Sequence, residues 1–139
     1  LPQLINNGVD LLPSICEWTG AQVPADCQGV SFCSIVEEGD TQKAHQPYVV
    51  SETYFFQTGG TRGWLVRTPK YKYVLYESGI NREMLYNMQT DRKEMCNLAI
   101  ESKYRNILLQ HRQMLQEWMK KHPLPGRIST LQFIPKEFE

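Results

Sequence analysis

Four short segments between Pro47 and Met88 carry residues typical of β-strands, and this run constrains the fold more than any other feature of the sequence. Turn residues separate the segments, as at Gly59-Gly60 and at Pro69-Lys70. The segments are rich in β-branched and aromatic side chains, and they predict strands at 48–56, 64–68, 71–76 and 83–88. Consecutive strands with such short connections favour an antiparallel meander, one apolar face of which has to be covered.

A long helix is predicted to supply that cover. Asp91, with Glu94 three residues later, resembles a capping box, in which each side chain satisfies a backbone donor of the first helical turn. Lys120 and Lys121 complement the negative end of a helix dipole and Pro123 prevents continuation, so the helix is expected to end near Lys121. Beyond the capping box, residues at spacings of four and three form one stripe: Ile100, Tyr104, Ile107, His111, Met114 and Trp118.

A shorter helix is predicted near the start of the chain. Apolar residues at helical spacing follow Asp10, and Gly20 stands where a left-handed C-cap would end the helix, so residues 10–19 are expected to be helical. These apolar residues are Leu11, Leu12, Ile15 and Trp18. From 21 to 46, proline and glycine interrupt the pattern, which favours a loop or linker.

Together these elements predict an α+β fold: a small four-stranded antiparallel sheet packed against a long C-terminal helix, preceded by a short helix and a linker. We expect three parts, at residues 1–46, 47–122 and 123–139. The last part is expected to be an extended tail.

Charge and hydropathy exclude several classes of partner. Fifteen basic residues balance fifteen acidic ones and are interspersed with them, so the chain lacks the single-sign field that favours nucleic acid or an anionic membrane. The sequence has no apolar run near the roughly 20 residues of a membrane-spanning helix. Its first ten residues lack the features of a signal peptide, so the compartment has to be inferred by other means.

The cysteines and histidines form no evident catalytic or metal site. The four cysteines, Cys16, Cys27, Cys33 and Cys96, have no C-x-x-C spacing, which argues against a metal site. We interpret them as small buried thiols, with a Cys27–Cys33 bridge left open as the alternative. His45, His111 and His122 fall on a linker, a helix stripe and a helix end, and His111 is interpreted as a hydrogen-bonded core histidine.

Seven segments, in order along the chain, resemble the formylglycine-dependent (type I) sulfatases of the arylsulfatase family, within the alkaline-phosphatase-like superfamily. They are 9–15 (V-D-L-x-P-T-x in the family), 20–24 (G-x-x-x-P), 27–31 (Q-G-x-S), 48–52 (Y-V-x-S-E), 66–73 (V-R-T-x-x-Y-K-Y), 83–88 (E-x-L-Y-D-L) and 91–99 (D-P-x-E-x-x-N-L-A). Two residues depart from the pattern, since Asn87 replaces an aspartate and Arg92 a proline. The resemblance implies the C-terminal portion of such an enzyme, with residues 1–46 as the end of its catalytic domain and the linker.

The resemblance also implies a chemistry that this chain does not carry. In the family, a cysteine within C-x-(P/A)-x-R matures to formylglycine, whose hydrated aldehyde attacks sulfur beside a calcium ion held by aspartates and an asparagine. None of the four cysteines stands in that motif. Formylglycine and calcium are therefore expected in the parent sulfatase, which would hydrolyse sulfate esters of sulfated carbohydrates. This chain alone is expected to be inactive and to need the N-terminal catalytic domain as its partner.

Two residues are candidates for contact with a sulfated substrate. Arg62 lies in a glycine-rich stretch that joins two predicted strands and lacks the spacing and lysine of a phosphate-binding loop, so we interpret it as a hairpin tip. A guanidinium at such a tip, and the linker residue His45, could border the substrate cleft.

Other interpretations of the chain stay open. The alternatives to a sulfatase part are a non-catalytic interaction module and a degenerate sulfatase-like protein. Homo-oligomerisation through an orphaned surface is also open, and the family suggests a periplasmic, secreted or lysosomal-type compartment.

Overall fold

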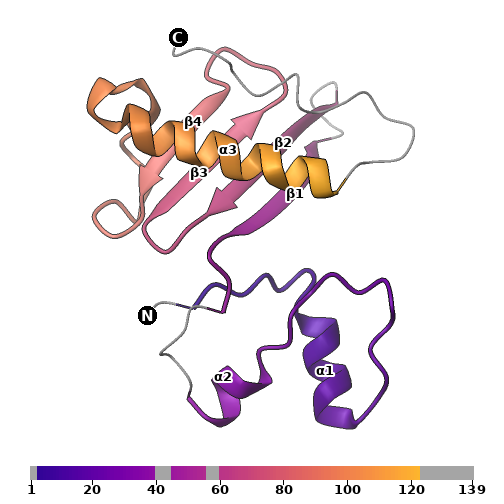
Figure 1. Ribbon diagram of the computed structural model, residues 1–139. Coiled ribbons are helices and arrows are strands. Elements are labelled where there is room, and N and C mark those ends of the chain that lie inside the picture. Colours follow the sequence, from indigo (N-terminus) through magenta and orange to yellow (C-terminus); the bar gives the residue numbers. More distant parts are fainter. Residues whose placement is uncertain (1–2, 40–44, 56–59, 123–139) are drawn as a thin grey trace. The chain divides into compact units, whose positions relative to one another are not determined.

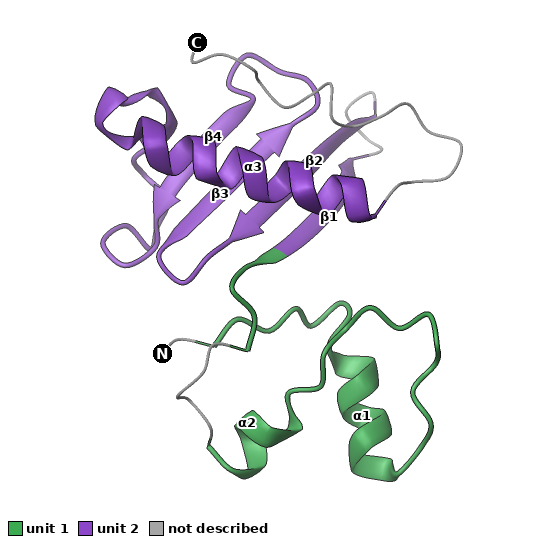
Figure 2. Ribbon diagram, viewed as in Figure 1, with its two compact units in different colours: residues 1–49 green, residues 50–139 purple. Residues whose placement is uncertain are grey.

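The structure, a computed structural model, describes residues 3–39, 45–55 and 60–122. The chain divides into two compact units, Leu1–Val49 and Val50–Glu139, which Figure 2 shows in green and purple. The tail predicted at 123–139 lies outside the described residues.

The second unit contains a four-stranded sheet whose strands follow the order of the sequence, β1-β2-β3-β4 (Figure 1). β3 pairs antiparallel with both β2 and β4, so the predicted meander is confirmed. The four predicted strands are also confirmed, although β2 begins three residues before its predicted start at Trp64. Their observed bounds are Val49–Phe55 (β1), Thr61–Arg67 (β2), Tyr71–Tyr76 (β3) and Glu83–Asn87 (β4).

A long helix, α3 (Arg105–Lys121), lies across one face of this sheet (Figure 1). The register aligns Val66, Tyr73 and Leu85 in one row, and all three are completely buried. Burying an apolar side chain of this size contributes roughly 2 kcal/mol, so this layer is the main source of the unit's stability. The predicted cover and its end at Lys121 are confirmed.

α3 turns a different stripe toward the sheet from the one predicted. His111 belongs to both, but Ile100 is 76% exposed and lies before the helix. The predicted stripe contained no charged residue. The buried face of α3 does contain one, Arg112, because it is paired with Glu83. The buried residues of α3 are Leu108, His111, Arg112, Leu115 and Met119.

The predicted capping box at Asp91 is wrong. The Asp91 carboxylate accepts hydrogen bonds from the backbone N–H groups of Met95 (3.1 Å) and Cys96 (2.9 Å), but in a turn rather than a helix. These bonds hold the pKa of Asp91 below its usual range. Glu94 has a left-handed φ of 57°, which no helix tolerates, and its carboxylate lies 2.6 Å from the Lys72 Nζ. Two short 3-10 helices, η2 (Leu98–Ile100) and η3 (Ser102–Tyr104), then lead into α3.

The outer edge of β4 is paired with a side chain instead of another strand. The Asn97 amide donates from Nδ2 to the carbonyl of Glu83 (3.1 Å) and accepts at Oδ1 from the N–H of Leu85 (3.0 Å). The same oxygen accepts from the N–H of Ala99, which caps η2. Asn97 thus occupies the place of a peptide group beside an edge strand that would otherwise leave these groups unpaired.

We expect Asn97→Ala to lower the free energy of unfolding by about 2 kcal/mol, because it leaves three backbone groups without a partner. Asn97→Asp should recover only part of this, since it keeps the acceptor oxygen but loses the donor. Urea unfolding of the three proteins measures the effect. Equal stability of Asn97→Ala and the unsubstituted chain would contradict this role.

The first unit is built around a short helix, α1 (Leu11–Thr19). Gly20 closes it in the left-handed conformation (φ 70°), as predicted. A second helix, α2 (Cys33–Glu37), falls in the stretch predicted as loop. Its five residues are too few to give a periodic signal, and the Trp18 indole N–H steadies its end by donating to Glu37 (2.7 Å).

The amphipathic character of α1 is inverted. Its buried residues include the polar Ser14, and Asp10, which immediately precedes it, has no exposed surface. Four large apolar residues are 45–50% exposed: Leu11, Leu12, Ile15 and Trp18. Contiguous exposed apolar surface marks a place where a folded protein meets another surface.

The cysteines agree only partly with the interpretation as buried thiols. Cys16 and Cys33 are buried as expected, whereas Cys27 is partly exposed and Cys96 is exposed on the turn after β4. All four are free thiols, so the alternative bridge between Cys27 and Cys33 is not formed. Within the described residues, no helix combines the length and apolar character needed to span a membrane.

Candidate functional site

The first unit contains a buried carboxylate, that of Asp10, at the centre of a hydrogen-bond network. Oδ2 accepts from the backbone N–H of Asn6 and from Gln46 Nε2, both at 2.7 Å, and Oδ1 accepts from the N–H of Val30 at 3.0 Å. Gly29 permits the last contact, because a Cβ at that position would lie 1.9 Å from the carbonyl oxygen of Val9. The carboxylate therefore ties the start of α1 to two distant loops.

His45, one of the two predicted substrate contacts, lies beside this network. Its Nε2 is 3.8 Å from Asp10 Oδ2, too far for a hydrogen bond, and only 6% of the side chain is exposed. This nitrogen is buried and has no hydrogen-bond partner among the residues that the structure describes, while the backbone N–H of His45 donates to Gln3. The structure thus places His45 within the first unit, with one imidazole nitrogen unsatisfied.

Arg62, the other predicted contact, lies within β2 and not at a hairpin tip as predicted, because the strand begins at Thr61. Residues 56–59, before Gly60, lie outside the described residues. Its guanidinium carbon is 5.8 Å from the centre of the Tyr54 ring, within the range of a cation–π interaction. Its Nε is buried, and no hydrogen-bond partner for it lies within the described part of the chain. The role of Tyr54 was not predicted, because its contact with Arg62 joins two strands and has no local sequence signal.

A buried ion pair, also not predicted, joins β4 to α3. Arg112 donates from Nε to Glu83 Oε1 (2.7 Å) and from Nη2 to Oε2 (2.5 Å), and the Tyr73 hydroxyl donates to Oε1 (2.7 Å). Burial and the charge of Glu83 raise the pKa of Tyr73 well above its usual range. Burial tends to lower the pKa of Arg112, but the pair with Glu83 outweighs it and raises that pKa. The two charged residues lie on separate elements, 29 positions apart, so the sequence has no local signal for this pair.

His111 is a hydrogen-bonded core histidine, as predicted. Its Nδ1–H donates to the carbonyl of Ile107 (2.8 Å), and the Thr68 hydroxyl lies 3.2 Å from Nε2. The Tyr71 ring meets the imidazole edge-on at 5.9 Å. Burial lowers the pKa of His111 below its usual range, despite the opposing effect of the bond to Ile107.

The lowered pKa of His111 should make the chain less stable in mild acid. The unfolded histidine takes up a proton below about pH 6.5, whereas the folded one resists it, so stability present above that pH is lost as the pH falls toward the lowered folded value. We expect the fall in Tm between pH 7.5 and 5.5 to be smaller in His111→Gln than in the unsubstituted chain. An identical fall in both proteins would contradict the buried neutral histidine.

The described residues contain no group of three or more histidine, cysteine, aspartate or glutamate side chains that could hold a metal ion. Asp10 uses its oxygens on hydrogen bonds, and Glu83 is paired with Arg112. The residues present therefore do not fit the formylglycine and calcium site of a sulfatase. What the described residues provide is a scaffold and several cations held over tyrosine rings, among them Arg62 over Tyr54.

Comparison with known protein families gives a match over almost all of the described chain. The family model for the C-terminal part of N-sulphoglucosamine sulphohydrolase matches residues 2–121. The chain belongs to this family. It is a sulfatase C-terminal domain, with the antiparallel sheet and long helix of its relatives.

Individual relatives of this sulfatase C-terminal domain agree with the family match. The Δ4,5-hexuronate-2-O-sulfatase of Bacteroides thetaiotaomicron is 42% identical over 112 residues, which cover 80% of this chain and 23% of that protein. A solved structure of a 2-O GAG sulfatase matches with a TM-score of 0.71 at 41% identity, covering 81% of this chain and 24% of the other. A structure solved with D-glucosamine-2-N,6-O-disulfate as its substrate shares the fold, with a TM-score of 0.73 at 23% identity, covering 92% and 25%. The chain thus spans about a quarter of the length of these relatives.

The structure gives a physical role to several residues through which this domain resembles sulfatases. Asp10 and Gly29 hold the first unit together, and Asn97 pairs with the edge of β4. Glu83 forms the buried ion pair. These contacts stabilise the scaffold of the described units.

Proposed function

We propose that this chain is the C-terminal part of a sulfatase that hydrolyses sulfate esters of sulfated carbohydrates. The observation that carries the proposal is the 42% identity to a hexuronate-2-O-sulfatase over 80% of the chain. A second relative, the N-acetylglucosamine-6-O-sulfatase of the same organism, supports the substrate class. The formylglycine nucleophile and the calcium ligands would lie in the remainder of the parent protein.

The inverted helix α1 supports the same proposal independently of the relatives. A self-sufficient interaction module gains nothing by exposing Leu11, Leu12, Ile15 and Trp18 while it buries Asp10 and Ser14. A catalytic domain packed on this stripe would cover it. We therefore propose that residues 1–46 complete the catalytic domain, and that the sheet and helix at 47–122 form its C-terminal subdomain.

Within the parent sulfatase, Arg62 and His45 are the proposed substrate contacts of this chain. Each has a buried side-chain nitrogen that lacks a hydrogen-bond partner among the described residues. A buried donor without a partner is rare in folded proteins, and a substrate oxyanion would satisfy it. The family favours a periplasmic, secreted or lysosomal-type compartment for the parent.

The proposal is tested by sulfate release from the whole parent protein and from this chain. We expect the whole protein to hydrolyse a 2-O-sulfated unsaturated uronide disaccharide, and to lose all activity when the cysteine of its C-x-(P/A)-x-R motif is replaced by alanine. We expect no release by this chain alone. A parent that lacks the motif and releases no sulfate would support a degenerate sulfatase-like protein instead, and turnover by the chain alone would contradict our account of its residues.

A further inference from the structure

Arg62 differs from three other arginines of the second unit in what its guanidinium contacts. The Arg112 guanidinium is paired with the Glu83 carboxylate, Arg67 donates to the carbonyls of Thr68 and Tyr71, and Arg82 donates from Nε to the carbonyl of Tyr76. Each of these has an oxygen acceptor within the chain. Arg62 has an aromatic ring under its guanidinium, and among the described residues it forms no ion pair.

The Glu77 carboxylate binds the backbone of Arg62, and no ion pair joins it to the guanidinium within the described residues. Glu77 Oε2 accepts from the backbone N–H of Arg62 at 3.3 Å, and the N–H of Glu77 donates to the carbonyl of Arg62 at 2.9 Å. These contacts fix the backbone of Arg62 and leave its guanidinium without an ion-pair partner in the described part of the chain. A partly buried charge without a partner is destabilising, so its presence calls for a ligand that is absent from the isolated chain.

The Tyr54 side chain holds the Arg62 guanidinium in position. Its ring lies beneath Arg62, and its hydroxyl occupies the space next to Gly60, where a Cβ would come within 2.5 Å of that oxygen. Gly60 also has a φ of 77°, which other residues adopt only under strain. The absence of a side chain at Gly60 therefore leaves room for the Tyr54 hydroxyl, while the Tyr54 ring supports the arginine.

We propose that Arg62, positioned by Tyr54, binds an oxyanion of the substrate, either a sulfate or a carboxylate group on an acidic sugar. A planar guanidinium offers two parallel N–H donors to such a group, and the aromatic ring holds the plane in one orientation. This inference rests on the proposed function for the identity of the ligand. It adds the kind of group recognised and the role of Tyr54 as a positioning residue.

Binding to this chain tests the proposal without requiring sulfatase activity. The probes are inorganic sulfate, glucuronate and a heparin disaccharide carrying both sulfate and carboxylate groups, each titrated at constant ionic strength and followed by NMR at the Arg62 side-chain N–H. We expect the disaccharide to shift this signal, Arg62→Ala to weaken binding about tenfold, and Arg62→Lys and Tyr54→Leu to weaken it about threefold.

The control Arg92→Ala removes an exposed arginine of the turn after β4 and should leave binding unchanged. A response to sulfate alone would assign the site to sulfate groups, and a response to glucuronate alone would assign it to carboxylates.

Thermal stability separates a ligand-binding role from a structural one. Because Arg62→Ala removes a charge that lacks a partner, we expect its Tm to be equal to or higher than that of the unsubstituted chain. A lowered Tm, or disaccharide binding as tight in Arg62→Ala as without the substitution, would overturn the proposal. Failure of the whole parent to release sulfate would refute the proposed function. It would not affect the binding of the disaccharide to Arg62 in this chain, which is measured separately.

Discussion

Glu83→Ala should lower the free energy of unfolding of the chain by about 3–5 kcal/mol, the loss typical when one partner of a buried ion pair is removed. The Arg112 side chain is only 6% exposed and donates two hydrogen bonds to this carboxylate, so the substitution leaves a buried positive charge without its carboxylate. It also removes the acceptor of the Tyr73 hydroxyl. Urea unfolding, monitored by the fluorescence of the buried Trp64, measures the change.

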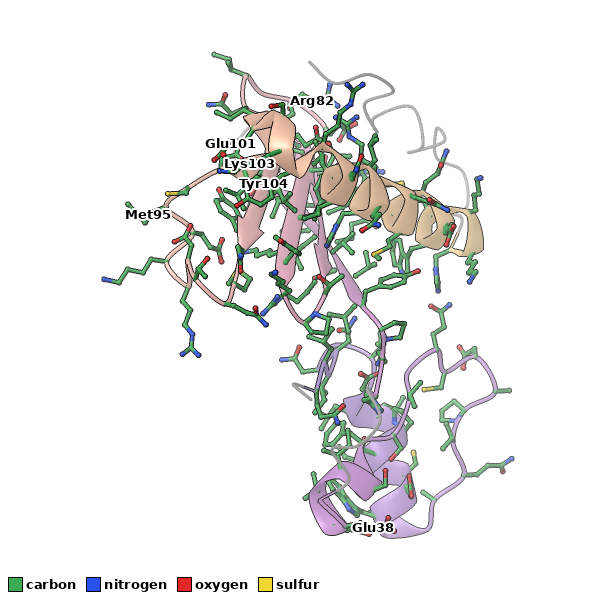
Figure 3. The ribbon with its side chains drawn as sticks, turned by 60° about the vertical axis from the view of Figure 1, so that its left-hand side comes forward. Glu38, Arg82, Met95, Glu101, Lys103 and Tyr104 are labelled. Carbon is green, nitrogen blue, oxygen red and sulfur yellow. The ribbon has the colours of Figure 1, made fainter. Side chains whose placement is uncertain are left out.

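An exposed ion pair provides the matched control. Lys103 lies 2.8 Å from Glu101, and both side chains are largely exposed, at 68% and 40% (Figure 3). Glu101→Ala should therefore change the free energy of unfolding far less than Glu83→Ala does. The double substitution Glu83→Leu with Arg112→Leu should recover most of the loss, because no unpaired charge remains. If Glu83→Ala and Glu101→Ala cost the same, the buried pair is not formed.

Asp10→Ala should open the first unit while leaving the second intact. The substitution removes the acceptor of three hydrogen bonds inside the unit, those donated by Asn6, Val30 and Gln46, at a cost of about 3 kcal/mol or more. Hydrogen–deuterium exchange should then rise throughout residues 11–37 and stay unchanged in β3 and α3. Asp26→Ala, which removes an exposed carboxylate of the same unit, is the control and should change neither region. Protection of α1 that survives Asp10→Ala would show that this carboxylate does not hold the unit together.

The sheet was predictable from the sequence because its strands combine aromatic and β-branched residues with clear turn residues. The end of α3 at Lys121 and the C-cap at Gly20 were predictable for the same local reasons. The start of α3 was not, because the Asp91 and Glu94 pattern serves a turn in which Glu94 adopts a left-handed conformation and pairs with Lys72. The spacing of Asp91 and Glu94 is the same in a helix cap and in this turn, so it does not distinguish the two structures.

The candidate site was less predictable than the fold. Arg62 could be selected from its place beside two glycines, but the support from Tyr54 and the unpaired Nε depend on contacts between strands. The pair of Glu83 and Arg112 joins residues 29 positions apart, so no pattern within a single element signals it. The burial of Asp10 and the exposure of Leu12 were not predictable, because the sequence of α1 does not indicate which of its faces is turned toward solvent.

The central claim is that this chain completes a larger sulfatase, which covers the apolar stripe of α1. Hydrogen–deuterium exchange of α1, compared between this chain and the whole parent protein, tests it most directly. We predict that the amides of residues 11–19 exchange at least tenfold more slowly in the parent, since packing against a catalytic domain would suppress opening of the helix. Equal exchange rates in the two proteins would show that the stripe stays exposed in the parent and would contradict the claim.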